Sequence, residues 1–208
     1  LLLLSISAPS LLSSDPHPDT SLSPPKNQRV LSEHVLLIVL DGVPRSVFDD
    51  AEVMPFLSEY EDFGVKINVR TSPLTLTGAC VKEIATGRNS APIDAILNWE
   101  VANEIQDDPF YYAAAQGQSV AFTGFYVWDN LYPEPYFTHQ TSPDYGFSDI
   151  SLADEDALNN VDEWISRPQH NLMVAHLGGT DHAAHIHGLD SEIYKERMKK
   201  LDQQLETL

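Results

Sequence analysis

The stretch LMVAHLGGTDHAAHIHG, residues 172–188, decides the fold of this chain because it joins a buried strand to a polar segment. Residues 172–177 are mostly apolar, which is typical of a parallel strand that is buried on both faces of a sheet. Residues 181–187 then hold one aspartate and three histidines. We therefore expect a strand whose carboxyl end leads directly into candidate functional side chains.

The same change between strand-like and helix-like segments runs outward along the chain. Strands are expected at residues 35–40 (VLLIVL), 65–69, 120–124 and 172–177. Helices are expected at residues 55–60, 78–86, 109–116, from a cap at Ser151, and over residues 194–208, where apolar residues recur at helical spacing. This alternation predicts an α/β fold with a mostly parallel central sheet flanked by helices on both faces. Ligands of such sheets bind beyond the carboxyl ends of the strands.

The N-terminal end differs from the rest of the chain. Residues 1–12 (LLLLSISAPSLL) are mostly apolar but shorter than the roughly 20 residues that span a bilayer. Residues 13–28 are rich in Ser, Pro and Asp and are typical of a linker. We predict that residues 1–30 are the remnant of a targeting or anchor segment with its linker, the alternative being an apolar end without such a role. Residues 31–208 then form part of a catalytic domain.

The charge of the chain limits its partners. The chain has 208 residues, of which 31 are acidic and 12 are basic, and its net charge is −19. This excess disfavours nucleic acid and anionic lipid surfaces, which bind clusters of Lys and Arg. The carboxylates either keep the protein soluble through their surface charge or bind cations. Cys80 is the single cysteine, so neither an intrachain disulfide nor a cysteine-based zinc site is possible.

Three polar sites follow predicted strands, and each has a structural alternative. Asp41-Gly42 could hold a divalent ion or simply form a turn. The hydroxyl-rich run 71–80 (TSPLTLTGAC) leads into a helix, where a hydroxyl can cap the helix or act as a nucleophile near phosphoryl oxygens. Asp181 and His185 are one helical turn apart and suit Zn²⁺, unless they belong to a polar surface loop. Together the three sites predict a partial two-metal centre for phosphoryl transfer.

With these motifs the chain, from about residue 35 to residue 208, resembles the alkaline phosphatase superfamily. Within it, the chain looks closest to the glycosylphosphatidylinositol (GPI) ethanolamine phosphate transferases. The superfamily motif Asp-His-x-Gly-His-x-x-Gly matches residues 181–188, and the aspartate that ends the first strand matches Asp41. Two further stretches, 124–133 (GFYVWDNLYP) and 198–208 (MKKLDQQLETL), resemble the transferases in particular.

The resemblance assigns roles to individual residues. Counting back from Thr86-Gly87 places the nucleophile at Thr77, and Asn98, eleven residues after that glycine, matches an asparagine that contacts phosphate. Two divalent cations are implied, with Zn²⁺ the expected kind. Asp41 and Thr77 would hold one of them. Asp181 and His185 would hold the other.

The chain also departs from the pattern of the superfamily. Phe125-Tyr126 replaces an acidic pair in the tryptophan motif, which leaves the substrate open, and Ala184 replaces a glycine. The later Asp-His-Gly and histidine that complete both metal sites do not occur before Leu208. We therefore expect an N-terminal fragment of a catalytic domain, incomplete at its C-terminus and inactive by itself.

The function expected from this resemblance is metal-dependent phosphoryl transfer with a threonine nucleophile. Phosphoethanolamine would pass from phosphatidylethanolamine to a GPI-type glycolipid, so the partners would be phosphate esters, including a phospholipid and a glycolipid, and no nucleic acid. The alternatives are a phosphodiesterase or nucleotide pyrophosphatase that uses water, and a non-catalytic relative. The expected location is extracytoplasmic and membrane-associated: the endoplasmic reticulum lumen in a eukaryote, the cell envelope or medium in a microbe.

Overall fold

The computed structural model describes residues 2–4, 6–7, 32–60, 64–71, 73–90, 92, 108–132, 137–141 and 150–208. In this part of the chain one five-stranded sheet has the order β1-β3-β7-β5-β6, and all its neighbouring strands are parallel. The strands are β1 (Leu2–Leu4), β3 (Val35–Leu40), β5 (Val120–Gly124), β6 (Thr138–Thr141) and β7 (Leu172–Leu177). A separate pair joins β2 (Ile6–Ser7) to β4 (Val69–Arg70).

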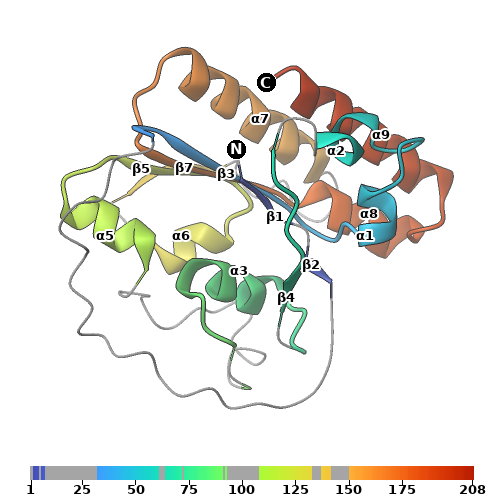
Figure 1. Ribbon diagram of the computed structural model, residues 1–208, viewed down its shortest axis with the longest axis horizontal. Helices are drawn as coiled ribbons and strands as arrows, with labels where there is room; N and C mark the ends of the chain where they lie inside the picture. The colour runs from blue at the N-terminus through green and yellow to red at the C-terminus, as the bar shows by residue number, and fades with distance from the viewer. Residues whose placement is uncertain are drawn as a thin grey trace.

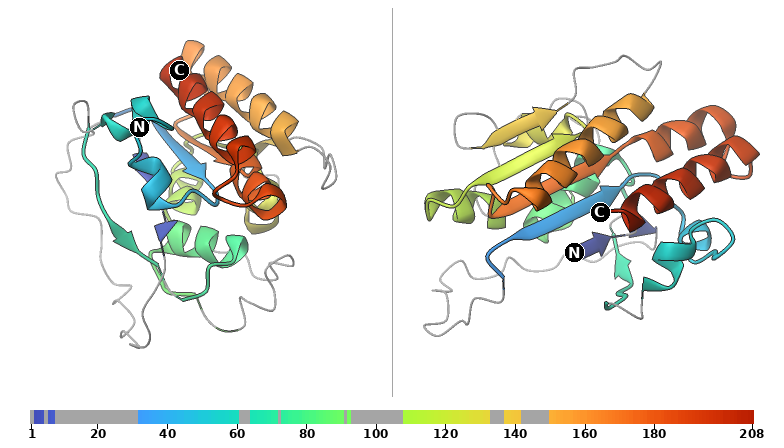
Figure 2. Two further views of the ribbon diagram at one scale, coloured as in Figure 1. Left: turned by 90° about the vertical axis from the view of Figure 1, so that its right-hand side faces the viewer. Right: turned by 90° about the horizontal axis from the view of Figure 1, so that it is seen from above.

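Helices cover both faces of the sheet, as Figure 1 and the two views of Figure 2 show. One layer holds α1 (Arg45–Phe48), α2 (Pro55–Ser58), α7 (Ile150–Ser166), α8 (Gly179–His187) and α9 (Glu192–Glu206). The other layer holds α3 (Thr77–Thr86), α5 (Pro109–Ala115) and α6 (Val127–Leu131). The predicted α/β fold with a parallel sheet between helical layers is confirmed.

The alternation of side chains along the strands divides the core in two. In β3, Ile38 and Leu40 pack with residues of α7 and α9, whereas Leu37 and Val39 pack with residues of α3, α5 and α6. Successive side chains of a strand point to opposite faces, so a central strand buried on both faces is mostly apolar. This requirement explains the continuous apolar run at residues 35–40 and the run at residues 172–177, in which His176 is the one polar residue.

The N-terminal part of the chain contributes to the sheet. Leu2–Leu4 pairs in parallel with residues 37–39 of β3. The predicted linker, residues 13–28, lies outside the described residues, so the division at residue 30 stays a prediction. Across the stretches that the structure describes, no helix is long and apolar enough to cross a membrane.

Two local predictions are wrong. The strand expected at residues 65–69 is limited to Val69–Arg70, and the side chains of Val65 and Ile67 are 83% and 69% exposed. Apolar alternation indicates a strand only where a layer covers one face, and these side chains are left in solvent. The helix expected to start from a cap at Ser151 already begins at Ile150, so Ser151 lies within its first turn.

Candidate active site at the carboxyl edge of the sheet

The site begins at the turn that follows β3. The backbone N–H of Asp41 donates to the carbonyl of Leu177 at 3.1 Å, which ties the ends of β3 and β7 together. Gly42 has φ of 67°, and a Cβ at this position would lie 2.6 Å from Cα of Asp181. Glycine is required on both counts, since it accepts positive φ and leaves room for the other chain segment. The turn therefore brings α8 directly against Asp41.

Thr77 is the first residue of α3, and its hydroxyl faces the carboxylate of Asp41. Its Oγ1 donates to Oδ2 of Asp41 at 3.1 Å. The N-cap of this helix is Leu76, and no side-chain cap hydrogen bond is made there. The hydroxyl of Thr77 is thus directed to a carboxylate of another element rather than to the backbone of its own helix.

Asp181 and His185 lie on one face of α8, as their spacing predicts. Nε2 of His185 is 3.5 Å from Oδ2 of Asp181, and the His185 side chain is 78% exposed. Burial and the charge of Asp41 raise the pKa of Asp181 above its usual value, against the opposing effect of His185, His176 and His182. Two carboxylates are therefore held close together at the edge of the sheet, an arrangement that a bound cation would stabilise.

Buried polar contacts fix the start of α8, although its N-cap Gly178 has no side chain to offer. Both carboxylate oxygens of Asp154, in α7, accept the N–H of Gly179 at 3.1 and 3.0 Å. The hydroxyl of Thr180 donates to the carbonyl of Asp41, and the hydroxyl of Tyr194 donates to the carbonyl of Gly42 at 3.1 Å. These bonds hold Asp181 in place from α7, α9 and the β3 turn.

His176 is a residue of the site that sequence analysis missed. It lies in β7 with 1% of its surface exposed, and its Nε2 is 3.4 Å from Oδ2 of Asp41. Its Nδ1 accepts a hydrogen bond from Nε1 of Trp128 at 3.0 Å. In the sequence, the only indication of its role is that His176 is the single polar residue of an otherwise apolar strand, one position before the strand ends.

The carboxylate of Asp41 is held in its charged form. Burial acts to raise the pKa of Asp41, but the hydrogen bonds from His176 and Thr77 and the backbone N–H of Gly42 together lower it below its usual value. An ionised carboxylate in this position can accept the hydrogen bond of the Thr77 hydroxyl and can also bind a cation.

The side chains that could bind divalent cations form two contacting pairs. One pair is Asp41 with Thr77, and the other is Asp181 with His185. Carboxylate, hydroxyl and imidazole groups are ligands that Zn²⁺ and similar ions take. Among the residues placed by the structure, no group of three or more His, Cys, Asp or Glu side chains could hold a metal ion by itself. Asn98 lies outside the described residues.

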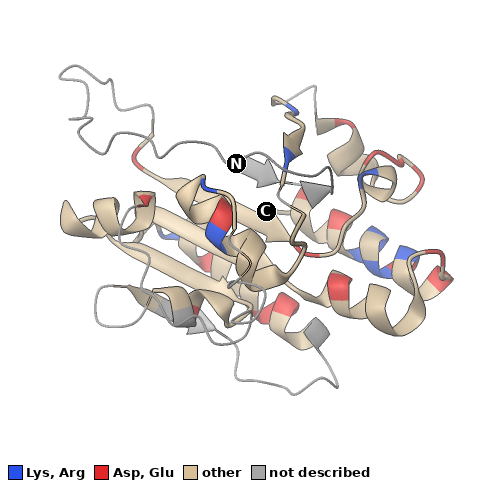
Figure 3. Cartoon of the chain, turned by 90° about the horizontal axis from the view of Figure 1, so that it is seen from below, with Lys and Arg blue, Asp and Glu red and all other residues tan. Residues whose placement is uncertain are grey.

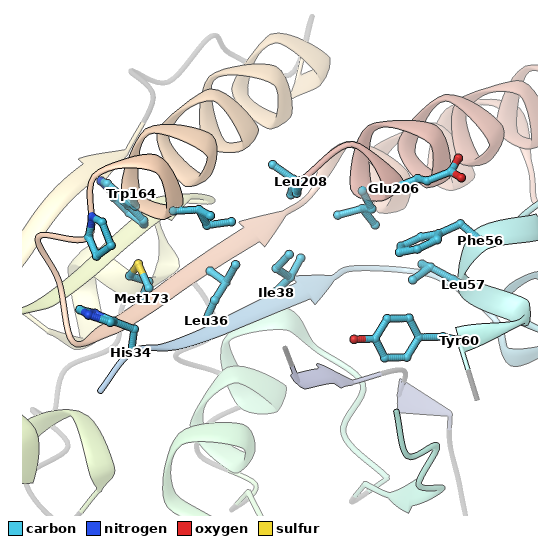
Figure 4. Close-up of a pocket in the computed structure, with 13 residues that line it drawn as sticks. His34, Leu36, Ile38, Phe56, Leu57, Tyr60, Trp164, Met173, Glu206 and Leu208 are labelled. Carbon is cyan, nitrogen blue, oxygen red and sulfur yellow. The ribbon is translucent and has the colours of Figure 1, made fainter. Parts of the chain in front are cut away.

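An apolar hollow of about 410 Å³ lies at the other ends of the strands (Figure 4). It is lined by Leu36 and Met173, near the starts of β3 and β7, and by Trp164, Phe56 and Leu208. Asp41 follows the opposite end of β3, so this hollow is separate from the polar site. In the part of the chain that the structure describes, acidic residues are spread over several helices and loops (Figure 3).

Comparison with known proteins identifies relatives of one kind. No protein-family model matches the chain. The chain is 24% identical over 188 residues to "GPI ethanolamine phosphate transferase 2, catalytic subunit" of Homo sapiens, with 88% of this chain and 19% of that protein covered. It is 24% identical over 139 residues to the human "GPI ethanolamine phosphate transferase 3, catalytic subunit", with 67% and 13% covered. A "GPI ethanolamine phosphate transferase 2" of Eremothecium gossypii is 23% identical over 192 residues, with 85% and 24% covered.

These similarities confirm the predicted relationship of the chain to the GPI ethanolamine phosphate transferases, within the alkaline phosphatase-like superfamily. The chain spans between 13% and 24% of the length of these three relatives. Most of the length of each relative therefore has no counterpart in this chain.

Proposed function

We propose that this chain is part of an enzyme that transfers phosphoethanolamine to a GPI-type glycolipid, with Thr77 as the nucleophile. The single observation that carries the proposal is the hydrogen bond of 3.1 Å from Oγ1 of Thr77 to Oδ2 of Asp41. It places an alcohol next to an ionised carboxylate, at the sheet edge where Asp181 also lies. The names of the relatives supply the substrate class.

The first step is attack by Oγ1 of Thr77 on the phosphorus of a phosphate diester such as phosphatidylethanolamine. The new bond joins Oγ1 to phosphorus, and the bond from phosphorus to the diacylglycerol oxygen breaks. The hydroxyl proton of Thr77 leaves by way of Oδ2 of Asp41 to solvent, and the departing diacylglycerol oxygen takes up a proton from solvent. The product of this half-reaction is a phosphoethanolamine ester of Thr77.

In the second step a hydroxyl of the glycolipid attacks the same phosphorus and loses its proton, the bond from phosphorus to Oγ1 of Thr77 breaks, and Oγ1 takes up a proton to restore the hydroxyl. Divalent cations bound by Asp41 and Thr77 on one side and by Asp181 and His185 on the other would supply charge neutralisation and a lower pKa for the attacking hydroxyl. Asn98, matched by resemblance, would contact a phosphoryl oxygen. Attack by water in place of the glycolipid would instead make the enzyme a phosphodiesterase.

A lipid donor and a glycolipid acceptor imply that the enzyme works at a membrane surface. We assign the site to the extracytoplasmic side, which is the endoplasmic reticulum lumen if the source is eukaryotic and the cell envelope if it is microbial. Labelling of the full-length protein with a reagent that does not cross membranes would test this assignment. In a eukaryotic cell, modification of the domain when only the plasma membrane is permeabilised would place the site in the cytoplasm and overturn the assignment.

The nucleophile is tested in the full-length protein with phosphatidylethanolamine that carries label in its phosphoethanolamine group. We expect the label to become covalently attached at Thr77, and to pass to the glycolipid when this acceptor is added. Thr77→Ala should abolish both events, and Thr77→Ser should keep part of each because the hydroxyl remains.

The matched control is Thr86→Ala, the same substitution at the other end of α3. The hydroxyl of Thr86 donates to the carbonyl of Lys82 within its own helix at 2.7 Å, so its loss should leave transfer intact. Full turnover in Thr77→Ala would overturn the role of Thr77. Release of free phosphoethanolamine without glycolipid labelling would identify a phosphodiesterase instead of a transferase.

A further inference from the structure

A chain of three polar side chains runs from inside the core to the site. Nε1 of Trp128, in α6, is 3.0 Å from Nδ1 of His176, in β7, and Nε2 of His176 is 3.4 Å from Oδ2 of Asp41. The side chains of Trp128 and His176 are 0% and 1% exposed, so water does not compete for these bonds. Asp41 is thus connected through His176 to a fully buried residue of α6.

The chemistry of the indole fixes the proton of His176. The N–H of an indole can only donate a hydrogen bond, so Nδ1 of His176 must accept and cannot carry a proton. A neutral imidazole has its single proton on the other nitrogen, which is Nε2. The N–H at Nε2 then points to the carboxylate of Asp41, and the opposite tautomer would direct a lone pair at that negative charge.

The backbone of His176 is held by contacts with the end of β5, and its ring has an aromatic neighbour. The N–H of Phe125 donates to the carbonyl of His176 at 3.0 Å, and a Cβ on Gly124 would lie 2.1 Å from the same carbonyl oxygen. The ring of Phe125 packs beside the imidazole, with 5.4 Å between the centroids. The side chain is therefore held between α6 and the start of the loop after β5.

We propose that Trp128 and His176 are positioning residues for the transfer proposed above. Trp128 holds His176 as the Nε2–H tautomer, and His176 in turn donates to Oδ2 of Asp41, the same oxygen that accepts the hydroxyl of Thr77. Two donors on one oxygen fix the plane of the carboxylate and with it the direction of the Thr77 hydroxyl. Partners that orient a ligand in this way typically change activity by about 10- to 100-fold when they are lost.

The tautomer is measured directly in the full chain labelled with ¹⁵N at histidine. Long-range proton–nitrogen correlation spectra distinguish a ring nitrogen that carries a proton from one that does not. We expect His176 to show an unprotonated Nδ1 and a protonated Nε2. A proton on Nδ1, or on both nitrogens, would overturn the proposal. This measurement needs no turnover, so it stands even if the proposed transferase activity is not found.

Trp128→Phe removes the N–H and keeps an aromatic ring in the same cluster. We expect His176 to lose its single tautomer and the kcat for transfer to fall by about tenfold, with KM little changed, because the side chain of Trp128 is fully buried. The matched control is Trp164→Phe, a buried tryptophan in the core on the other face of the sheet. It should leave both the tautomer and kcat as in the wild type.

A second pair of variants tests His176 itself. The amide N–H of Gln can reach the place of Nε2, whereas the shorter Asn reaches only the place of Nδ1, so His176→Gln should keep several times more activity than His176→Asn. An equal loss of activity in His176→Gln and His176→Asn would mean that His176 acts only through packing, and would contradict the proposal. A wild-type tautomer and wild-type kcat in Trp128→Phe would contradict it as well. If Trp128→Phe does not fold, the Gln and Asn pair decides.

Discussion

At Gly42 the absence of a side chain determines how closely two candidate metal-binding groups approach. The residue has φ of 67°, and Cα and Oδ1 of Asp181 would lie 2.6 and 2.7 Å from a Cβ placed there. Both contacts are far inside the van der Waals distance. Both the positive φ and the close approach of Asp181 therefore require glycine at position 42, and substitutions can separate these two requirements.

We predict that Gly42→Ala abolishes activity and destabilises the fold by more than positive φ alone would. Gly117 is the matched control, since it has φ of 75° but a Cβ there would meet nothing within 4 Å. Gly117→Ala should cost about 1–2 kcal/mol of unfolding free energy, the usual penalty of this backbone region, and leave activity intact. Urea unfolding and a transfer assay measure the difference, and equal costs at the two glycines would show that Asp181 can move away freely.

Residues of the site differ in how well the sequence predicts them. Asp41 follows β3, Thr77 starts α3, and Asp181 and His185 lie in the helix that follows β7, so their place at the sheet edge can be inferred from order along the chain. The structure brings Thr77 against Asp41 and Asp181 against the adjacent Gly42, and it places His185 beside Asp181. His176 could not be inferred in this way, because the partner that gives it a role, Trp128, lies 48 positions away in the sequence.

At the scale of elements, α8 depends on a residue of α7 for its N-terminal cap. Gly178 and Gly179 begin the helix, and a Cβ on Gly179 would lie 2.2 Å from Oδ2 of Asp154. Arg197 of α9 lies 3.6 Å from the same oxygen. The sequence does not reveal such a cap, since the usual signal is a polar residue directly before the helix. Strands with mostly apolar runs, such as β3 and β7, are predicted correctly because burial on both faces favours apolar residues along the whole strand.

Asp154 gives this cap a pH dependence that can be tested. Burial raises the pKa of Asp154 from 3.8 to about 6, against the hydrogen bond from Gly179 and the charge of Arg197. The folded state therefore holds this proton more tightly than the unfolded state does. The resulting stabilisation is complete below about pH 4 and is lost as the pH rises through about 6.

We predict that Asp154→Asn removes this pH dependence of the unfolding free energy. The difference in unfolding free energy between wild type and variant should then change between pH 4 and 6 and stay constant above pH 6. Urea unfolding at several pH values measures it. Asp162→Asn, on an exposed part of the same helix, controls for removal of a negative charge. A difference that is flat across this range for Asp154→Asn would show that Asp154 remains ionised in the folded protein.

For the whole molecule, the sheet separates two cores that share strands but not side chains. Leu201 of α9 belongs to the core on one face, and Val81 of α3 to the core on the other. Leu201 and Val81 are 4% and 1% exposed, so shortening either side chain should leave a cavity in its core. Because a packed sheet lies between them, a cavity on one face should not relax the packing on the other.

We predict that Leu201→Ala and Val81→Ala cost about 2–5 and about 1–3 kcal/mol, and that the double variant costs their sum to within about 0.5 kcal/mol. A pair inside one core provides the contrast. The rings of Phe122 and Tyr132 stack with 5.0 Å between centroids, so Phe122→Leu and Tyr132→Leu should be non-additive by about 0.5–3 kcal/mol. Urea unfolding of the six variants measures both cycles. If the coupling energy between Leu201 and Val81 were as large as that between Phe122 and Tyr132, the strands would have to shift together with the helices. The packing on one face of the sheet would then depend on the packing on the other face.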